Sequence, residues 1–509
     1  MRSIELLNKV NLEISTTPDP TLPEGLMARL EYNLPSGDLR PRVAILTLGC
    51  KVNYSETEAM AENFQQAGYA LVDPAGGDKL DVFVVNTCTV THVAGKKSRQ
   101  MLRRAKRHNP QALVVATGCH VYTNPAEVEA MQAVDLVVGK SQEEQLVGLV
   151  SQRLNYELSY RPEPSPRLFV DGASPTPVNP QPTIAREHYR TRAMVKIQDG
   201  CNAGCAFCIV PTARGGPRSI TMAEVVAEVR TKALAGYQEV ILTGVHLGKY
   251  RAPRLGDSET RPLRLRALLE RILSEISPAQ LPRLRITSLE PQDYDPMLLE
   301  LWQQHPRLNR QFHLALQAGC DATLARMRRG YNTEKFARIV EQIRRELPDA
   351  SITTDIIVGF PGETEAEFEA SLGFAASLGF AKIHVFPFSV RRGTLAATMP
   401  DQIAETVKKA RSERLRLLSD ELSRQWRSQF VGNIRQVLWE HPETATDGKI
   451  WSGLTDNYIR VYMPVTSTTD FNFHNTITPT LLTGLAGAGD AEGVTGSLVA
   501  DVKSLGAEL

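Results

Sequence analysis

Residues 194–208, MVKIQDGCNAGCAFC, place a short apolar strand directly before three closely spaced cysteines. Five further runs of the same kind follow, separated by helical stretches such as 221–236 and 336–347. These runs are EVILTGV (239–245), RLRITSL (283–289), FHLALQ (312–317), ITTDIIVGF (352–360) and KIHVFPF (382–388). Six successive βα units predict a parallel barrel, complete or partial, over residues 190–430, which a charged helix near 401–430 ends.

A second α/β domain is predicted over residues 41–150. Four short runs there are apolar on both faces, as buried parallel strands are: RVAILTLG (42–49), DVFVVNT (81–87), ALVVATG (112–118) and VDLVVG (134–139). Residues 1–40 are interpreted as an N-terminal extension. Residues 151–189 are interpreted as a proline-rich linker, and residues 431–509 as a small all-β module with glycine-rich turns. The fold class is therefore α/β with a C-terminal β-barrel.

Composition is that of an ordinary globular protein. The 509 residues are 42% hydrophobic and 23% charged, which excludes a disordered or fibrous chain. Lys and Arg (58) balance Asp and Glu (57), so a nucleic-acid partner has to be argued from local patches. No apolar run approaches the ~18–20 residues of a membrane span, and the N-terminus lacks the apolar core of a signal peptide. We therefore expect a cytoplasmic protein without a membrane partner.

Cys201, Cys205 and Cys208 are the first group of candidate ligands among seven cysteines. At spacings of four and three residues, three thiolates fit on one loop and can hold three irons of a 4Fe–4S cubane, which leaves the fourth iron open. The alternatives are a zinc site or three unrelated core cysteines. A zinc site would normally have a fourth Cys or His nearby, and none is close in sequence.

Cys50, Cys88 and Cys119 are the second group. Each closely follows a predicted strand, and the carboxyl ends of parallel strands meet at one edge of a sheet, so the three thiols could hold a second cluster. The alternative is that they are inert, buried cysteines. Cys320 has no partner nearby in sequence and is interpreted as a structural thiol.

The CxxxCxxC spacing after the first barrel strand, with Phe207 before the last cysteine, resembles the radical S-adenosylmethionine signature. Further segments resemble the methylthiotransferases, a radical enzyme family with two 4Fe–4S clusters, each held by three cysteines. These segments are TLGCKVNYSETEAM (47–60), NTCTVT (86–91), ATGC (116–119), LTGVHLGKY (242–250), HLALQAGCDATLARMRRGYNT (313–333) and TTDIIVGFPGET (353–364). The resemblance covers about residues 42–505. It implies that the C-terminal module is an RNA-binding barrel of the TRAM type.

The resemblance also implies a reaction. GCKVN (49–53) resembles the branch that adds a methylthio group to carbon 2 of N6-threonylcarbamoyladenosine at position 37 of transfer RNA. The departures from the family pattern are Tyr54, where glutamine is common, and Ala318, where serine is usual. The cluster of Cys201, Cys205 and Cys208 would cleave S-adenosylmethionine, and the other would hold or supply sulfur. The residues that would line the S-adenosylmethionine pocket are Phe207, Gly244, Gln317 and Gly359.

Residues 96–108, KKSRQMLRRAKRH, predict an amphipathic helix with a basic stripe of Lys96, Arg99, Arg103 and Arg107. We interpret the stripe as a phosphate track for the anticodon stem-loop of a transfer RNA, with a solvated surface as the alternative. The C-terminal module, by contrast, holds four Lys or Arg against nine Asp or Glu after residue 431.

Further expected partners are an electron donor such as flavodoxin or ferredoxin, and we expect a monomer. Alternative substrates are N6-isopentenyladenosine in transfer RNA or a ribosomal protein. A non-catalytic iron–sulfur RNA-binding or electron-transfer protein is the alternative of another class.

Overall fold

The computed structural model describes residues 40–74, 79–155, 190–252, 264–445, 448–464, 472–486 and 493–498. Nearly all of the expected N-terminal extension and of the proline-rich linker lies outside the described residues. The described residues fall into two compact units: those of the smaller lie within Met1–Gly49, Thr57–Cys88 and Lys96–Ser165, and those of the larger within Cys50–Glu56, Thr89–Gly95 and Pro166–Leu509. Among the helices described, none is both long and apolar enough to cross a bilayer.

The smaller unit is built on a parallel sheet with the strand order β2-β1-β3-β4-β5. Its strands are β1 (Arg42–Thr47), β2 (Ala70–Leu71), β3 (Val82–Thr87), β4 (Leu113–Gly118) and β5 (Leu136–Val137). The predicted parallel α/β domain is confirmed, although only two residues of the expected strand at 134–139 pair. The chain reverses its direction of travel across the sheet between β1 and β3. In open sheets of this kind, ligands bind beyond the carboxyl ends of the strands at that switch point.

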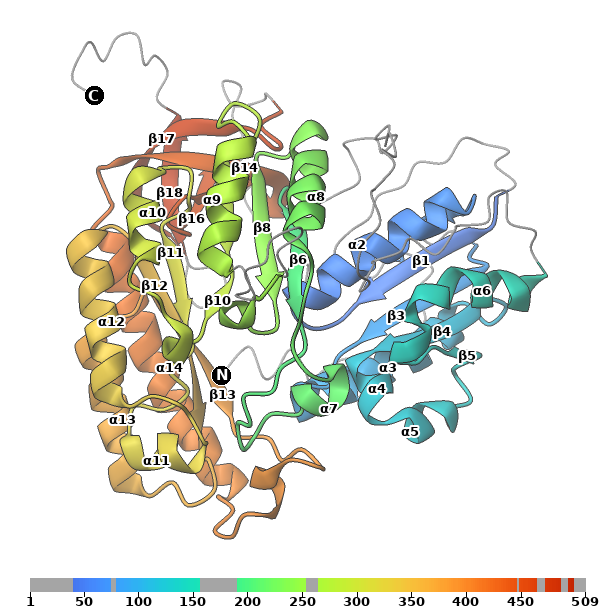
Figure 1. Ribbon diagram of the computed structural model, residues 1–509, viewed down its shortest axis with the longest axis horizontal. Coiled ribbons are helices and arrows are strands. Elements are labelled where there is room, and N and C mark those ends of the chain that lie inside the picture. The colour runs from blue at the N-terminus through green and yellow to red at the C-terminus, as the bar shows by residue number, and fades with distance from the viewer. Residues whose placement is uncertain are drawn as a thin grey trace, which may run out of the picture. The chain divides into compact units, whose positions relative to one another are not determined.

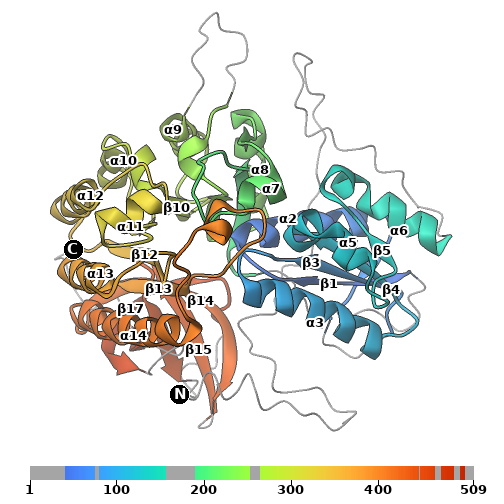
Figure 2. The ribbon, with the colours of Figure 1, turned by 90° about the horizontal axis from the view of Figure 1, so that it is seen from below.

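Helices cover both faces of this sheet. They are α2 (Lys51–Gln66), α3 (His92–His108), α4 (Cys119–Thr123), α5 (Pro125–Glu129) and α6 (Leu146–Leu154), with a 3-10 turn at Lys140–Gln145. Phe64 of α2 and Val147 of α6 pack in one core with Val84 of β3. Figure 2 shows α3 on the opposite face from α2 and α6. Because both faces are covered, the strands are apolar throughout, as the sequence predicts.

The larger unit begins with two four-stranded sheets, in the orders β7-β6-β8-β9 and β10-β11-β12-β13 (Figure 1). The strands are β6 (Ala193–Asp199), β7 (Arg218–Ser219), β8 (Glu239–Gly244), β9 (Arg283–Ile286), β10 (Ser288–Leu289), β11 (Gln311–Leu314), β12 (Ser351–Val358) and β13 (Lys382–Pro387). All pair in parallel except β7, which runs antiparallel to β6. Only Thr287 separates β9 from β10, so the chain passes directly from one sheet to the other. Six βα units form, as predicted. Of the two predicted forms, a complete or a partial barrel, the partial barrel is confirmed.

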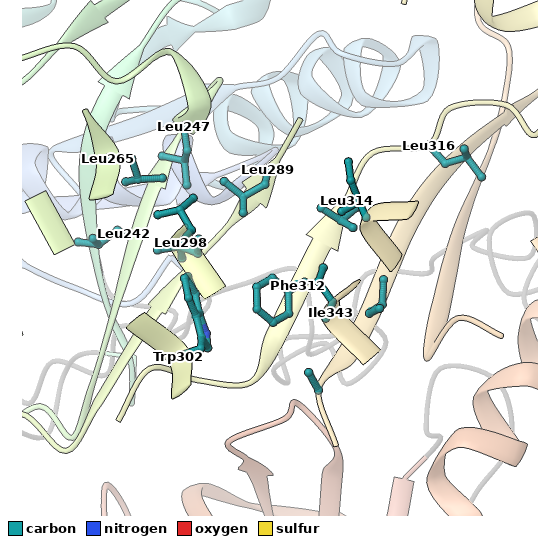
Figure 3. Close-up of a cluster of buried hydrophobic side chains, with 14 of the residues drawn as sticks. Leu242, Leu247, Leu265, Leu289, Leu298, Trp302, Phe312, Leu314, Leu316 and Ile343 are labelled. Atoms are coloured by element: carbon teal, nitrogen blue, oxygen red, sulfur yellow. The ribbon is translucent and has the colours of Figure 1, made fainter. Parts of the chain in front are cut away.

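Helices pack on one face of these sheets. They are α7 (Val210–Arg214), α8 (Met222–Leu234), α9 (Leu265–Glu275), α10 (Leu298–Gln304), α11 (Asp321–Arg326), α12 (Thr333–Glu346), α13 (Glu365–Leu378) and α14 (Glu405–Ser428), with 3-10 turns at Leu247–Lys249, Pro291–Asp293 and Leu395–Thr398. In Figure 3 Trp302 of α10 and Ile343 of α12 lie beside Phe312 of β11, in one continuous hydrophobic core. Many strand residues of the other parity are polar, among them Gln198, Arg285 and Thr353.

The C-terminal module is a closed barrel of five strands in the order β14-β15-β16-β18-β17. They are β14 (Ile434–Ala445), β15 (Gly448–Thr455), β16 (Arg460–Pro464), β17 (Ile477–Ala486) and β18 (Gly493–Leu498). Trp439, Val461 and Leu482 fill its interior. The predicted all-β module is confirmed, and closure leaves none of its strands as a free edge.

Candidate active site

The loop after β6 carries Cys201, Cys205 and Cys208, at the carboxyl end of the strand. Gly200 begins the loop with a φ of 70°, and a β-carbon there would lie 2.0 Å from the carbonyl oxygen of Gly216, so only glycine fits. The backbone N–H of Cys201 donates to the carbonyl oxygen of Gly215 at 3.0 Å. Cys201 is buried, and the other two cysteines are half-buried. Backbone contacts therefore fix the loop.

His246, which follows β8, contacts the first of these thiols. Its Nδ1 lies 3.4 Å from Cys201 Sγ, and its Nε2 lies 2.6 Å from Asp293 Oδ2. Burial alone raises the pKa of Cys201, but hydrogen bonds from His246 and from the backbone of Ala203 bring it below its ordinary value. Burial lowers the pKa of His246, but the hydrogen bonds to Asp293 and Cys201, together with the charge of Glu290, outweigh it and raise that pKa to about 9. The pair thus favours a thiolate at Cys201.

Arg329, between α11 and α12, contacts the second thiol. Its Nη1 donates to Cys205 Sγ at 3.1 Å, and its Nη2 forms an ion pair with Glu290. Its Nε donates to the hydroxyl of Tyr331 at 3.1 Å, and that hydroxyl donates to the backbone oxygen of Leu316 at 2.8 Å. Burial raises the pKa of Cys205 above its ordinary value, and the Arg329 guanidinium offsets only part of that rise. The guanidinium is held from three sides beside the loop, where it stabilises negative charge.

The three thiols fit a cubane cluster better than a single ion. In the part of the chain that the structure describes, Cys201, Cys205 and Cys208 do not bring their sulfur atoms within 4.8 Å of one another, as ligands of one metal ion would. A 4Fe–4S cluster carries its iron atoms at the corners of a larger body and spreads its ligands. Three thiols beside the cations of His246 and Arg329 are a donor set that suits an anionic iron–sulfur group.

An ion network fixes the start of α2 within the larger unit. Arg214, 3% exposed, donates from Nη1 to Glu56 Oε1 at 2.7 Å and to Asp199 Oδ1 at 3.0 Å. Its Nη2 donates to Asn53 Oδ1 at 3.0 Å, and Lys196 Nζ donates to Glu56 Oε1 at 2.9 Å. Asn53 and Glu56 follow Cys50 in the GCKVN segment and its continuation. The network therefore ties this segment to β6 and to the end of the Cys201 loop.

Comparisons with known proteins agree with this arrangement. A family model described as uncharacterized protein family UPF0004 matches residues 42–139, and the radical SAM superfamily matches residues 195–375. The threonylcarbamoyladenosine tRNA methylthiotransferase MtaB of Bacillus subtilis (strain 168) is 39% identical over 420 residues, which cover 82% of this chain and 89% of that protein. The chain belongs to the radical S-adenosylmethionine methylthiotransferase family. It is accordingly an enzyme of a superfamily that uses a 4Fe–4S cluster and S-adenosylmethionine.

Two further relatives mark the two branches that this methylthiotransferase resembles. The protein named MtaB in Aquifex aeolicus (strain VF5) is 35% identical over 436 residues, covering 82% of this chain and 96% of that protein. The tRNA-2-methylthio-N(6)-dimethylallyladenosine synthase of Methylacidiphilum infernorum (isolate V4) is 30% identical over 429 residues, covering 82% and 88%.

The residues expected to line the S-adenosylmethionine pocket have structural roles of their own in this methylthiotransferase. Phe207 packs edge-to-face on Phe360, with ring centroids 6.5 Å apart. A β-carbon at Gly244 would lie 2.9 Å from the backbone oxygen of Gln198. Gly359 and Gln317 both adopt positive φ, at 71° and 66°. Contact of these residues with S-adenosylmethionine stays a prediction.

The second cysteine group follows three neighbouring strands. Cys88 and Cys119 are buried and come directly after β3 and β4, and Cys50 comes three residues after β1. Ser98 holds the Cys88 backbone: its hydroxyl accepts from the N–H at 3.0 Å and donates to the carbonyl at 2.9 Å. The strands β1 and β3 flank the switch point of the sheet. Their use as ligands stays a prediction.

The predicted basic helix forms as α3. Its apolar face is buried as expected, at Ser98, Met101, Leu102 and Ala105. Lys96, Arg103 and Arg107 are exposed, but Arg99 is half-buried and pairs with Glu127, its Nη1 lying 3.3 Å from Oε1. Three of the four predicted cations are therefore exposed, and the fourth, Arg99, is held in an ion pair. Contact with RNA stays a prediction. Cys320 ends the loop before α11 and is half-buried.

The side chains that surround the Cys201 loop were not predicted from the sequence. His246 and Arg329 lie inside segments already quoted for the resemblance, LTGVHLGKY and HLALQAGCDATLARMRRGYNT, but their contacts with sulfur join distant elements. Asp293 and Glu290 lie in an unremarkable stretch and orient the two cations. A polar residue one or two positions after a barrel strand, as His246 is, is the one signal that could have indicated this role.

Proposed function

We propose that this methylthiotransferase acts on N6-threonylcarbamoyladenosine at position 37 in the anticodon loop of transfer RNA and attaches a methylthio group to carbon 2. The observation that carries the proposal is the match to a protein of that activity by name, 39% identical over 82% of the chain. Three further relatives with the same name are 30–35% identical over 78–82% of the chain. The GCKVN segment at 49–53 supports the same branch.

The reaction replaces an unactivated C–H bond by a C–S bond, for which acid–base chemistry offers no starting point. A bound 4Fe–4S cluster with S-adenosylmethionine supplies one-electron chemistry for removing that hydrogen. Cys201, Cys205 and Cys208 would hold this cluster. His246 and Arg329 would keep the first two thiols in place and balance the negative charge there. Their own partners, Asp293 and Glu290, hold them in that orientation.

A second 4Fe–4S cluster, held by Cys50, Cys88 and Cys119, would hold or supply the sulfur that is methylated. Its support is topological: each cysteine closely follows one of three adjacent parallel strands, and two of these strands, β1 and β3, flank the sheet's switch point. The hydroxyl of Ser98 bonds to the backbone of Cys88 and so fixes it, and these two bonds do not involve the Cys88 thiol.

The transfer RNA would meet the exposed cations of α3 and the barrel formed by β14–β18. We expect a monomer that works in the cytoplasm, with a flavodoxin or ferredoxin as electron donor. The C-terminal barrel has more acidic than basic residues. We therefore expect it to contact the RNA through its shape or through a few residues, and not through a large basic surface.

The test supplies the cluster-loaded enzyme with S-adenosylmethionine, a sulfide source and a chemical reductant. Matched transfer RNAs carry N6-threonylcarbamoyladenosine, N6-isopentenyladenosine or plain adenosine at position 37. Mass spectrometry of the digested nucleosides should find the methylthio product only from the first RNA. Product only from the isopentenyl RNA would move the enzyme to the other branch. Cys320→Ala serves as the matched cysteine control and should keep full activity.

A further inference from the structure

The helix-free face of the second barrel sheet gathers polar groups. Side chains alternate along each strand, so Phe312, Ile352 and Ile383 enter the hydrophobic core with the helices. Residues of the other parity then lie on the opposite face. This face carries His313 on β11, Thr353 and Asp355 on β12, and His384 on β13.

Strand register brings three of these side chains together. Asp355 pairs directly with His384, and His313 pairs with Thr353, two residues before Asp355. One ligand atom from each of His313, Asp355 and His384 lies within 4.8 Å of the other two. His313 Nε2 is 3.3 Å from Asp355 Oδ2, and the two imidazole centroids are 5.8 Å apart. Among the residues that the structure describes, no other set of His, Cys, Asp or Glu side chains converges in this way.

The first histidine is oriented as a metal ligand would be. Its Nδ1 lies 3.0 Å from Thr353 Oγ1, which leaves Nε2 directed toward Asp355. Gln311 in turn donates to the same hydroxyl at 3.3 Å. A ligating histidine typically bonds through its second ring nitrogen to a fixed polar partner, which sets the tautomer and the ring plane. Thr353 is the polar partner of the second ring nitrogen of His313.

We infer that His313, Asp355 and His384 bind one divalent transition-metal ion, separate from the cysteine-held clusters. Two imidazoles and one carboxylate from three adjacent strands are a donor set that suits Fe²⁺, Mn²⁺, Co²⁺ or Zn²⁺, and three protein ligands leave positions open for water or an oxygen ligand. His384 is exposed and Asp355 half-buried, so an ion can enter from solvent.

The alternative is a hydrogen-bonded His–Asp pair with a second histidine beside it. Such a pair needs only His313 and Asp355, and it predicts no role for His384, which contributes a ring contact to His313. Metal binding requires all three. The two possibilities therefore differ in what happens when the exposed histidine is removed.

The experiment measures Mn²⁺ binding to the cluster-loaded enzyme under anaerobic conditions, by the loss of the electron paramagnetic resonance signal of free Mn²⁺. Mn²⁺ is the probe because it prefers carboxylate and imidazole to thiolate and does not compete for the cysteines. Oxidised 4Fe–4S clusters give no signal. We expect one tight Mn²⁺ per chain, at least tenfold weaker binding in His384→Ala and Asp355→Asn, and roughly tenfold weaker binding in Thr353→Val.

His441→Ala is the matched control. His441 stacks on His474 with ring centroids 3.9 Å apart, and neither histidine belongs to the group of His313, Asp355 and His384. The substitution removes one imidazole from this other histidine pair. It should leave Mn²⁺ binding unchanged. Iron content per chain and the thermal midpoint show whether each variant is folded. His384→Ala should disturb the fold least, because His384 is exposed on β13. Absence of stoichiometric Mn²⁺ binding in the parent, or parent-like affinity in folded His384→Ala, would overturn the inference.

Discussion

Arg329 donates a hydrogen bond from Nη1 to the sulfur of Cys205 at 3.1 Å, across 124 positions of sequence. The same guanidinium pairs with Glu290, so its charge is fixed at the cysteine loop rather than free to move into solvent. Cations and hydrogen bonds at cluster sulfurs are among the ways in which proteins set the potential of an iron–sulfur centre. We therefore expect Arg329 to position the cluster that we propose for Cys201, Cys205 and Cys208.

Arg329→Gln should retain the cluster but lower its reduction potential, because one positive charge beside it is lost. A charge-assisted hydrogen bond contributes about 1.5–3 kcal/mol, so the rate of 5′-deoxyadenosine formation should fall by roughly 10- to 100-fold. Redox titration and a cleavage assay without RNA measure the two effects. The adjacent, exposed Arg328 provides the control: Arg328→Gln should match the parent. An unchanged potential in Arg329→Gln would reduce the contact to a packing role.

Two cysteine groups predict about eight irons per reconstituted chain. Cys201→Ala should leave about four irons and abolish cleavage of S-adenosylmethionine. The triple alanine variant of Cys50, Cys88 and Cys119 should also leave about four irons but keep some cleavage. Iron and sulfide analysis with chromatography of 5′-deoxyadenosine gives the result. Eight irons in the triple variant would show that these cysteines are inert.

The exposed cations of α3 should contribute to RNA binding. Lys96, Arg103 and Arg107 changed together to Gln should weaken transfer RNA binding and flatten the slope of log affinity against log salt by about 2–3 units. Arg99 is left in place because it pairs with Glu127. A triple change of Lys409 and Arg416, exposed on α14, and Arg153, exposed on α6, is the charge-matched control. Equal slopes in the two triple variants would mean that α3 is ordinary surface.

We expect substitution of Gly359 to lower the stability of the protein, whether or not this glycine also contacts S-adenosylmethionine. Its φ is 71°, and a β-carbon there would lie 2.2 Å from Cγ of the Lys408 side chain. Gly359→Ala should therefore destabilise the protein by about 1–3 kcal/mol. Gly373, inside α13 with open space around it, is the matched position, and Gly373→Ala should stabilise by about 0.5–1 kcal/mol. Thermal unfolding measures both, and a parent-like midpoint for Gly359→Ala with weakened S-adenosylmethionine binding would favour the pocket role.

Stability should fall as the pH drops from 7 to 5, in part through His474. Burial and the neighbouring His441 lower its pKa to about 4, against an ordinary value near 6.5. Between those values the unfolded chain binds a proton that the folded chain does not, so unfolding becomes easier as the pH falls. With allowance for solvent screening, the loss is about 1 kcal/mol by pH 5.

Thermal midpoints of the parent and of His474→Gln at pH 7 and pH 5 test this expectation. The variant should lose less stability over that interval. His108→Gln, an exposed histidine on α3, should follow the parent. Identical pH dependence in all three proteins would exclude His474 as a contributor.

Local pattern was enough to predict the elements that are long, apolar and separated by clear turns. The barrel strands, α3, α12 and the cysteine positions follow from alternation, helical periodicity and spacing, which act over a few residues. The two-residue strands β2 and β7 were missed because so short a pairing leaves no pattern, whereas β9 and β10 both lie inside the one run predicted at 283–289. β15 and β17 were missed because their polar and glycine-containing sequences resemble loops, and only closure of the barrel makes them strands.

The sequence by itself determined the cysteine spacings, the order of the βα units and the family resemblance, because these are properties of neighbouring residues. Tertiary structure decided which cations meet the thiols and which histidines meet Asp355. His246 lies 45 residues from Cys201, and Arg329 lies 124 from Cys205. Contacts over such separations depend on strand order and register, which place one side chain of each strand on a shared face. No local preference of the chain specifies that placement.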